Sequence, residues 1–242
     1  MGELKCVNLS CSRGDFRLEL AALTLKKGEK VALLGENGCG KTTLLQILAG
    51  LLPAQGEIYY GSPHSTERWD TLSPQERALY AAYLPQEAEV LFNLTVDELI
   101  QLCLNSVKLL QCEQRQAVLE ATDALPLLTR TYPSLSGGEK RRAMLARIFC
   151  READFIFLDE PTAPLDLRHA AKFMRYAAAA PCAIVAAMHD LNLAVRYFDR
   201  FLLMKDGRIL FDRQKAELDA GELEAIYGIG LHRCGDHFVP ER

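Results

Sequence analysis

Long apolar runs are scarce in this 242-residue chain. The longest, YAAAAPCAIVAAM at residues 176–188, is interrupted by Pro181 and is too short to cross the roughly 30 Å hydrocarbon core of a bilayer. The N-terminal MGELKCVNLS also lacks the apolar stretch of a secretory signal peptide. We therefore expect a soluble protein that meets a membrane only through a partner.

Paired cysteine motifs and long basic runs are also missing. The eight cysteines form no C-x-x-C pair, which argues against zinc ribbons and thioredoxin-like redox sites and favours reduced thiols in a cytosolic protein. The formal net charge is only −4, so bulk electrostatics give no sign of nucleic acid binding. We interpret the basic pair Arg141–Arg142 as part of a solvated helix face.

Short apolar runs that end in polar residues indicate a mainly parallel sheet. KVALLG (30–35) predicts a strand that leads into a helix with an apolar stripe, KTTLLQILAGLL (41–52). DFIFLDE (154–160) and CAIVAAMHD (182–190) predict further buried strands, and RFLLMKDGRILF predicts a hairpin around Asp206–Gly207. Ligands bind at the carboxyl edge of open parallel sheets, so the polar residues after these strands are site candidates.

The remaining segments predict two additions to this sheet. Residues 1–25 and 57–60 are expected to form a small antiparallel β layer. Residues 88–150 contain no convincing strand and several helix starts, which favours a helical insertion. We expect a single domain over all 242 residues, with an α/β core at 1–87 and 151–242 and a helical subdomain at 88–150.

The segment GENGCGKTT matches the phosphate-binding pattern G-x-x-x-x-G-K-[ST] in full, between a predicted strand and a predicted helix. Lys41 would neutralise the β and γ phosphates, and the Thr42 hydroxyl would hold Mg²⁺. Cys39 lies near a helix N-terminus, where we expect a lowered thiol pKa and reaction with maleimides. The phosphate-binding residues of this P-loop are Gly35, Glu36, Asn37, Gly38, Cys39, Gly40, Lys41, Thr42 and Thr43.

Polar side chains at other strand ends complete the predicted site. Asp159 would reach Mg²⁺ through water, since an unpaired carboxylate at the end of an apolar strand is costly. Glu160 would polarise the attacking water as a general base. His189 would contact the γ-phosphate or water, and Gln86 would bind Mg²⁺ or water between the core and the helical segment. These residues predict a P-loop NTPase core.

The segment SLSGGEKRR (134–142) combines a helix start with two glycines. Ser136 and Glu139 have capping-box spacing, as do Ser-Pro-Gln-Glu at 73–76 and Thr-Val-Asp-Glu at 95–98. Glycine is a poor helix former, so Gly137 and Gly138 need another explanation. Side chains at these positions would keep a phosphate from the first N–H groups of the helix, so we interpret the segment as a second phosphate clamp.

Five segments in one order, GENGCGKTT, LPQ, LSGGEKRRAMLAR, FIFLDEPTAPLD and MHDLNLA, resemble the ATPase subunit of ATP-binding cassette (ABC) transporters. The resemblance covers residues 4–230. It implies that Gln86 is the Q-loop glutamine, that Ser136–Gly138 belong to the signature motif and that Asp166 lies in the D-loop. It also implies that Asp159 and Glu160 are the Walker B aspartate and the catalytic glutamate, and that His189 is the switch histidine.

The resemblance also implies cofactors, partners and location. Glu160, His189 and Lys41 would be catalytic, and Thr42, Gln86 and Asp159 would surround Mg²⁺ beside bound ATP. Two subunits would form a head-to-tail homodimer in which each signature motif closes over the partner's ATP. The dimer would drive a separate transmembrane permease from the cytoplasmic face of the membrane. The C-terminal segments look most like importers of metal chelates such as siderophores, haem, cobalamin or molybdate, which implies a substrate-binding protein and no nucleic acid.

Two departures from the family pattern bear on function. The D-loop has Ala163-Pro164 where the family usually has Ser-Ala, and proline stiffens the turn. The aromatic residue that often stacks on adenine is missing near Cys11–Arg13, so Arg13 or Phe16 would replace it.

Several rival functions remain open at this point. They are an exporter ATPase, a soluble ABC protein acting on ribosomes or DNA, a plain P-loop kinase and a non-hydrolysing module. The single P-loop, the lack of a long coiled coil, the LSGGE segment and the complete set of catalytic residues argue against the last three.

Overall fold

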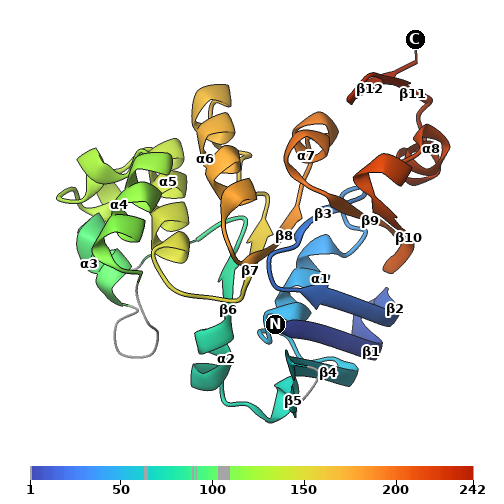
Figure 1. Ribbon diagram of the computed structural model, residues 1–242, viewed down its shortest axis with the longest axis horizontal. Helices are drawn as coiled ribbons and strands as arrows, with labels where there is room; N and C mark the ends of the chain where they lie inside the picture. Colours follow the sequence, from blue (N-terminus) through green and yellow to red (C-terminus); the bar gives the residue numbers. More distant parts are fainter. Residues whose placement is uncertain (1, 63–64, 89, 91, 103–109, 242) are drawn as a thin grey trace.

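Ten strands form a single hydrogen-bonded sheet in the computed structural model, which describes residues 2–62, 65–88, 90, 92–102 and 110–241 (Figure 1). From one edge to the other the order is β5 (Ser65–Arg68), β4 (Gln55–Ser62), β1 (Glu3–Arg13), β2 (Phe16–Lys26), β10 (Arg208–Gln214), β9 (Arg200–Lys205), β3 (Lys30–Leu34), β8 (Ala183–Ala187), β7 (Phe155–Asp159) and β6 (Ala81–Leu84). A separate hairpin near the C-terminus pairs β11 (Leu231–Cys234) with β12 (His237–Pro240).

The two halves of the large sheet differ in direction. Strands β9, β3, β8, β7 and β6 are parallel neighbours, as the buried apolar runs predict. Strands β5, β4, β1 and β2 are antiparallel neighbours, which confirms the predicted antiparallel layer. Strand β10 joins the halves because it is antiparallel to β9 and meets β2 at one parallel pair, Arg208 with Glu19.

The predicted hairpin at RFLLMKDGRILF is present as β9 and β10. Its turn residues Asp206 and Gly207 have φ values of 48° and 76°. A Cβ on Gly207 would lie 1.9 Å from the Arg17 carbonyl oxygen, so the close approach of β2 requires glycine here.

Eight α-helices of the described residues pack around this sheet. They are α1 (Lys41–Leu48), α2 (Pro74–Tyr80), α3 (Val96–Gln101), α4 (Cys112–Ala121), α5 (Gly137–Phe149), α6 (Leu167–Ala179), α7 (Leu191–Tyr197) and α8 (Ala220–Tyr227). The three predicted capping boxes begin α2, α3 and α5. Across the residues that the structure describes, none of the helices has both the length and the apolar character required to traverse a membrane.

Helix α1 is shorter than the predicted helix at 41–52. It ends at Leu48, with Ala49 as its C-cap, and Gly50 follows with a φ of 70°. Leu51 therefore lies outside the helix and is 63% exposed, so the apolar stripe predicted within residues 41–52 does not extend to it. The left-handed glycine ends the helix because it turns the chain away from the helical path.

Apolar residues of the parallel strands face two separate cores. Val31 and Leu33 of β3 pack on one side with α1 and the antiparallel strands β1 and β2. Ala32 and Leu34 pack on the other side, where the helices α3 to α8 supply most of the core. Side chains alternate along a strand, so a continuous apolar run fits a sheet that is covered on both faces.

Helices α3, α4 and α5 form a group on one side of the molecule (Figure 1). Both α3 and α4 pack on α5, while α4 also contacts α6 and α5 contacts β6. We call α3, α4 and α5 the helical group. The predicted subdomain boundaries at 88 and 150 remain a prediction.

We expect Leu33→Ala to lower the free energy of unfolding by about 2–5 kcal/mol, since the fully buried Leu33 side chain fills the core under α1. Urea denaturation of the full chain measures this change. Leu210→Ala is the control, because Leu210 is 47% exposed, and its effect should stay within about 0.5 kcal/mol. Equal losses in both variants would contradict this account of the core.

Candidate functional site

The P-loop connects β3 to α1, and its lysine folds back along the loop. The Lys41 Nζ donates hydrogen bonds to the carbonyl oxygens of Gly35 at 2.7 Å and Glu36 at 2.9 Å. Gly40 has a φ of 107°, and a Cβ there would lie 2.5 Å from the Phe16 ring. The ammonium group and the helix N-terminus therefore place positive charge on the same side of the loop, where an anion would bind.

The thiol of Cys39 differs from the expectation drawn from the sequence. Cys39 is only 6% exposed, and burial raises the pKa of its thiol. The Lys41 ammonium, 4.0 Å from Sγ, lowers this pKa by less than burial raises it. The prediction of a lowered thiol pKa was therefore wrong, because removing the thiolate from water costs more than the nearby positive charge returns.

Asp159 at the end of β7 reaches the P-loop directly. Its Oδ2 accepts hydrogen bonds from the hydroxyl groups of Thr42 at 2.7 Å and Tyr83 at 3.4 Å. The residue is 1% exposed, and burial raises the pKa of its carboxyl group. Tyr83 was not among the predicted site residues, because only the parallel pairing of β6 with β7 brings it beside Asp159.

Glu160 lies between two side chains from the neighbouring strand ends. Its Oε1 is 2.5 Å from His189 Nε2, and its Oε2 accepts a hydrogen bond from Gln86 Nε2 at 3.1 Å. Its backbone has a φ of 46°, a left-handed conformation that costs on the order of 1–3 kcal/mol for a residue other than glycine. The structure thus brings the predicted Gln86, Glu160 and His189 together.

A cavity of about 620 Å³ opens over the P-loop. It is lined by Arg13, Phe16, Asn37, Gly38, Gly40, Lys41, Thr42, Thr43, Gln86, Glu160 and His189. Residues from the P-loop and from three other strand ends therefore share one cavity with the two candidates for base stacking. Eight predicted residues do not line it: Gly35, Glu36 and Cys39 of the P-loop, Asp159 at the end of β7, and Ser136, Gly137, Gly138 and Asp166.

The signature segment begins α5 apart from this cavity. Ser136 caps the helix, and Glu139 completes the capping box. A Cβ on Gly137 would meet no described atom within 4 Å, and one on Gly138 would come 3.3 Å from the Pro164 carbonyl oxygen. Packing within this chain therefore does not require glycine at position 137.

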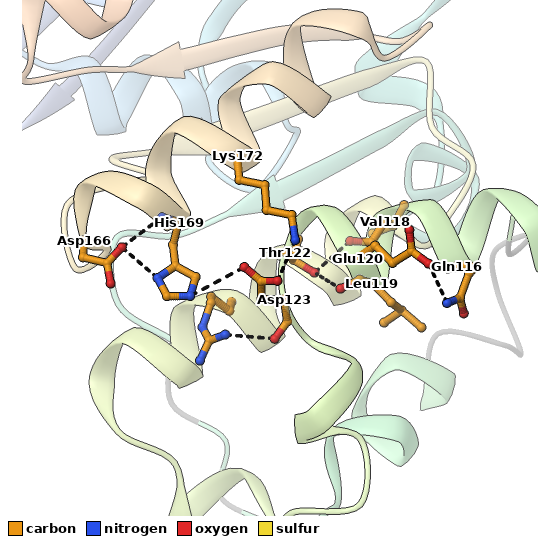
Figure 2. A network of polar contacts seen from close by, with 10 residues as sticks. Gln116, Val118, Leu119, Glu120, Thr122, Asp123, Asp166, His169 and Lys172 are labelled. Atoms are coloured by element: carbon orange, nitrogen blue, oxygen red, sulfur yellow. Dashed lines mark hydrogen bonds and ion pairs between the residues drawn. The ribbon is translucent and has the colours of Figure 1, made fainter.

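Asp166 caps α6 and belongs to a polar network that reaches the helical group (Figure 2). Its Oδ1 accepts a hydrogen bond from the His169 backbone N–H at 2.9 Å and lies 2.8 Å from His169 Nδ1. The other ring nitrogen of His169 is 3.6 Å from an Asp123 carboxylate oxygen, and Lys172 Nζ is 2.6 Å from the second. The network connects α6 to the turn after α4.

Arg141 is not on a solvated helix face, so that part of the interpretation of Arg141–Arg142 was wrong. The side chain is 5% exposed and points to the carboxyl ends of β6 and β7, where backbone carbonyl groups accept its hydrogen bonds. Sequence alone could not show this, because two adjacent basic residues on a helix point in different directions and only the packing decides which is buried.

A match to a known protein family assigns the chain to that family. A family model described as ABC transporter matches residues 18–163, which include the P-loop, Gln86, the signature segment and Glu160. The chain belongs to the ABC transporter family. This confirms the resemblance inferred from the motifs and identifies the chain as an ATPase of the ATP-binding cassette type.

Relatives of this ABC ATPase share more than a third of its residues. The hemin import ATP-binding protein HmuV of Vibrio parahaemolyticus is 38% identical over 236 residues, covering 91% of this chain and 89% of that protein. HmuV of Vibrio cholerae is 37% identical over 226 residues, covering 87% of this chain and 85% of that protein.

Solved structures agree on the fold. A metal-chelate type ABC transporter in an inward-facing conformation superposes with a TM-score of 0.75 at 24% identity, over 100% of this chain and 98% of that one. A dimeric ATP-binding cassette bound to ADP and Pi superposes with a TM-score of 0.71 at 23% identity, over 89% of this chain and 99% of that one. The predicted α/β fold class is thereby confirmed.

We expect Cys39 to react with a maleimide at least about tenfold more slowly at pH 7 than the exposed Cys112 and Cys234, because its thiol is buried with a raised pKa. The reaction rate of Cys39 should increase as the pH rises above the usual pKa of a thiol, because the thiolate then forms. Peptide mass spectrometry over a time course follows each cysteine. Modification of Cys39 first would contradict the buried geometry.

Proposed function

We propose that this ABC ATPase works as a head-to-tail homodimer that hydrolyses ATP and drives import of hemin or a related metal chelate through a separate permease. The observation that carries the catalytic part is the placement of Glu160 at the cavity over the P-loop, between Gln86 and His189. A carboxylate held there can accept a proton from a water that attacks the γ-phosphate.

Two residues that share the cavity with Glu160 have distinct roles in this proposal. His189 fixes one carboxylate oxygen and faces the cavity, where it would contact the γ-phosphate or the attacking water. Lys41 would leave the P-loop carbonyl groups to neutralise the phosphates. The left-handed backbone of Glu160 orients the base at the end of β7, and the remaining phosphate contacts would come from the P-loop backbone.

The oxygen atoms beside the P-loop suit Mg²⁺. The Thr42 hydroxyl and the Asp159 carboxylate are already 2.7 Å apart, and oxygen groups are the ligands that this cation prefers. Asp159 is buried with a raised carboxyl pKa, so a divalent cation would stabilise its charged form. The Gln86 amide would supply a further oxygen. A bound Mg²⁺ would offset charge on the ATP phosphates.

The dimer accounts for the signature-motif and D-loop residues, which lie outside the cavity. Ser136, Gly137 and Gly138 would bind the phosphate of ATP held by the partner's P-loop, which explains a glycine at 137 that this chain's own packing does not require. Asp166 would lie at the same interface. A dimeric cassette is known for a related fold, and the partner's signature motif would complete each site.

The two departures from the family pattern affect adenine binding and the D-loop. Arg13 and Phe16 both line the cavity, so either side chain can stack on the adenine of ATP. The Leu165 backbone N–H donates to the Thr162 carbonyl at 3.0 Å, so the segment around Ala163-Pro164 forms a turn. This turn lies beside Gly138 through the Pro164 carbonyl and would couple the signature motif to the dimer interface.

The cargo and the location are inferred from relatives. Proteins named for hemin import are 35–38% identical to this chain, and a metal-chelate type transporter shares its fold. We infer a place on the cytoplasmic face of the membrane, attached to permease subunits that receive cargo from a substrate-binding protein. An ABC exporter also shares the fold, so the preference for import rests on the relatives named for hemin import.

Cargo identity can be tested in proteoliposomes that hold this ATPase with its co-purified permease and binding protein. We expect hemin to stimulate ATP hydrolysis and to accumulate with the vesicles, whereas iron-free protoporphyrin should have a weaker effect if the metal is recognised. Stimulation by a ferric siderophore alone would support metal-chelate import, with the siderophore rather than hemin as the cargo. A lack of response to every chelate would contradict the proposed import function.

Glu160→Gln should retain ATP binding and lower turnover by about 10²–10⁴-fold, because the base is lost while the phosphate contacts stay. The variant should accumulate as a closed dimer with ATP, which gel filtration detects. The wild-type chain with ADP is the control and should elute as a monomer. A monomer with ATP, or turnover at the wild-type rate, would count against the assignment of Glu160.

Ser136→Arg should bind ATP through its intact P-loop and yet be inactive, because the signature motif acts on the partner's nucleotide. Lys41→Ala should be inactive for the opposite reason. Mixing the two variants should restore part of the ATPase activity, since a mixed dimer holds one complete site. Ser73→Arg, which disrupts the matching capping box of α2, controls for loss of a helix cap. No recovery on mixing would refute the head-to-tail arrangement.

A further inference from the structure

Arg141 is an unusually well-bonded buried cation next to the proposed catalytic site. It lies on the second turn of α5, five residues after the Ser136 that caps this helix. Its planar guanidinium group occupies the space between the loop that follows β6 and the loop that follows β7. These two strands are parallel neighbours, so their carboxyl ends lie side by side.

Every N–H of the Arg141 guanidinium group has an acceptor in this space. An arginine side chain has five N–H donors, and Arg141 makes five hydrogen bonds, each to a backbone carbonyl oxygen. The acceptors are Pro161 at 3.1 Å from Nε, Pro85 at 2.6 Å and Gln86 at 3.2 Å from Nη1, and Asp159 at 2.5 Å and Glu160 at 2.7 Å from Nη2.

The bonding pattern shows what the side chain does physically. Carbonyl groups, rather than a carboxylate, surround the guanidinium, so Arg141 acts on the backbone of the two loops. Burial lowers the pKa of Arg141 to about 10, which leaves the group protonated at neutral pH. A rigid fork with five donors fixes the spacing of both loops at once, whereas a lysine places its donors at a single point.

The two loops carry the residues around the attacking water. Gln86 and Glu160 each give a carbonyl oxygen to Arg141, and their side chains also bond to each other at 3.1 Å. The Glu160 carbonyl is part of the left-handed residue at the end of β7, so Arg141 helps to hold this strained backbone in place. Arg141 itself is fixed to the helix that begins with the signature motif.

We propose that Arg141 is a positioning residue that ties α5 to both loops, so that a movement of the signature helix carries Gln86 and Glu160 with it. This inference rests on the proposed function, in which Glu160 is the general base. When the phosphate of ATP held by the partner binds at the start of α5, Arg141 then fixes Glu160 in the subunit to which that α5 belongs. Arg141 touches neither ATP nor water in this role and acts only through the two loops.

Arg141→Lys and Arg141→Met test the proposal in the full chain. We expect kcat to fall by about 10–100-fold, the scale of a misplacement near 1 Å, with KM and ATP affinity close to wild type because the P-loop is untouched. The decrease in kcat should be smaller for Arg141→Lys than for Arg141→Met. Amide hydrogen exchange should increase in the loops at 85–86 and 159–161. A wild-type kcat in both folded variants would overturn the proposal.

Lys172→Met is the matched control. Lys172 of α6 forms an ion pair at 2.6 Å with Asp123, in the turn after α4, and so also connects the helical group to the rest of the molecule (Figure 2). This ion pair involves neither of the two loops. We expect its kcat and its exchange at those loops to match wild type. An equal loss in Lys172→Met and Arg141→Lys would mean general loosening of the helices and would overturn the proposal.

A double variant separates this inference from the proposed function. Arg141→Lys in the Glu160→Gln background should still form the ATP-dependent dimer, because only the placement of the base is affected. Failure of that dimer, when Glu160→Gln alone dimerises, would assign Arg141 to dimer closure and overturn the positioning role. Wild-type turnover by Glu160→Gln alone would instead contradict the assignment of Glu160 as the general base, whatever the activity of the Arg141 variants.

Discussion

The parallel pairing of β3, β8, β7 and β6 is the constraint on which the site depends. Parallel strands end at one edge of the sheet, so residues far apart in sequence meet there without further adjustment. The P-loop follows β3, Glu160 follows β7, His189 follows β8 and Gln86 follows β6. The two apolar cores on either side of the sheet hold these strands in register and thereby set the distances within the cavity.

Burial decides how the charged groups at this edge behave. Asp159 and Cys39 both lie out of water, and in each the raised pKa reflects the cost of a buried negative charge. The buried positive charge of Arg141 also loses contact with water, and hydrogen bonds to five backbone carbonyl groups offset that loss. The region is therefore arranged around positive charge and oriented dipoles, which suits a ligand with several negative phosphates. A carboxylate such as Glu160 is kept there by neighbours on both sides.

Motifs with a fixed spacing were predictable from sequence because their chemistry is local. The P-loop, the three capping boxes and the hairpin at Asp206–Gly207 depend on residues within a few positions of each other, and the structure contains all of them. Predictions that depended on the surroundings of a residue in the folded chain were wrong in three cases. Leu51 lies beyond the end of α1, Cys39 has a raised rather than a lowered thiol pKa, and Arg141 is buried rather than solvated.

Apolar periodicity and motif spacing along the chain were enough to predict the α/β class, the family and the identity of the residues at the strand ends. Which of these residues come into contact depends on how the chain folds. Tyr83 joined Asp159, and Arg141 joined the loops of Gln86 and Glu160, because strand pairing and helix packing bring together groups that are distant in sequence. Burial and electrostatics depend on all surrounding atoms, and these exist only in the folded chain.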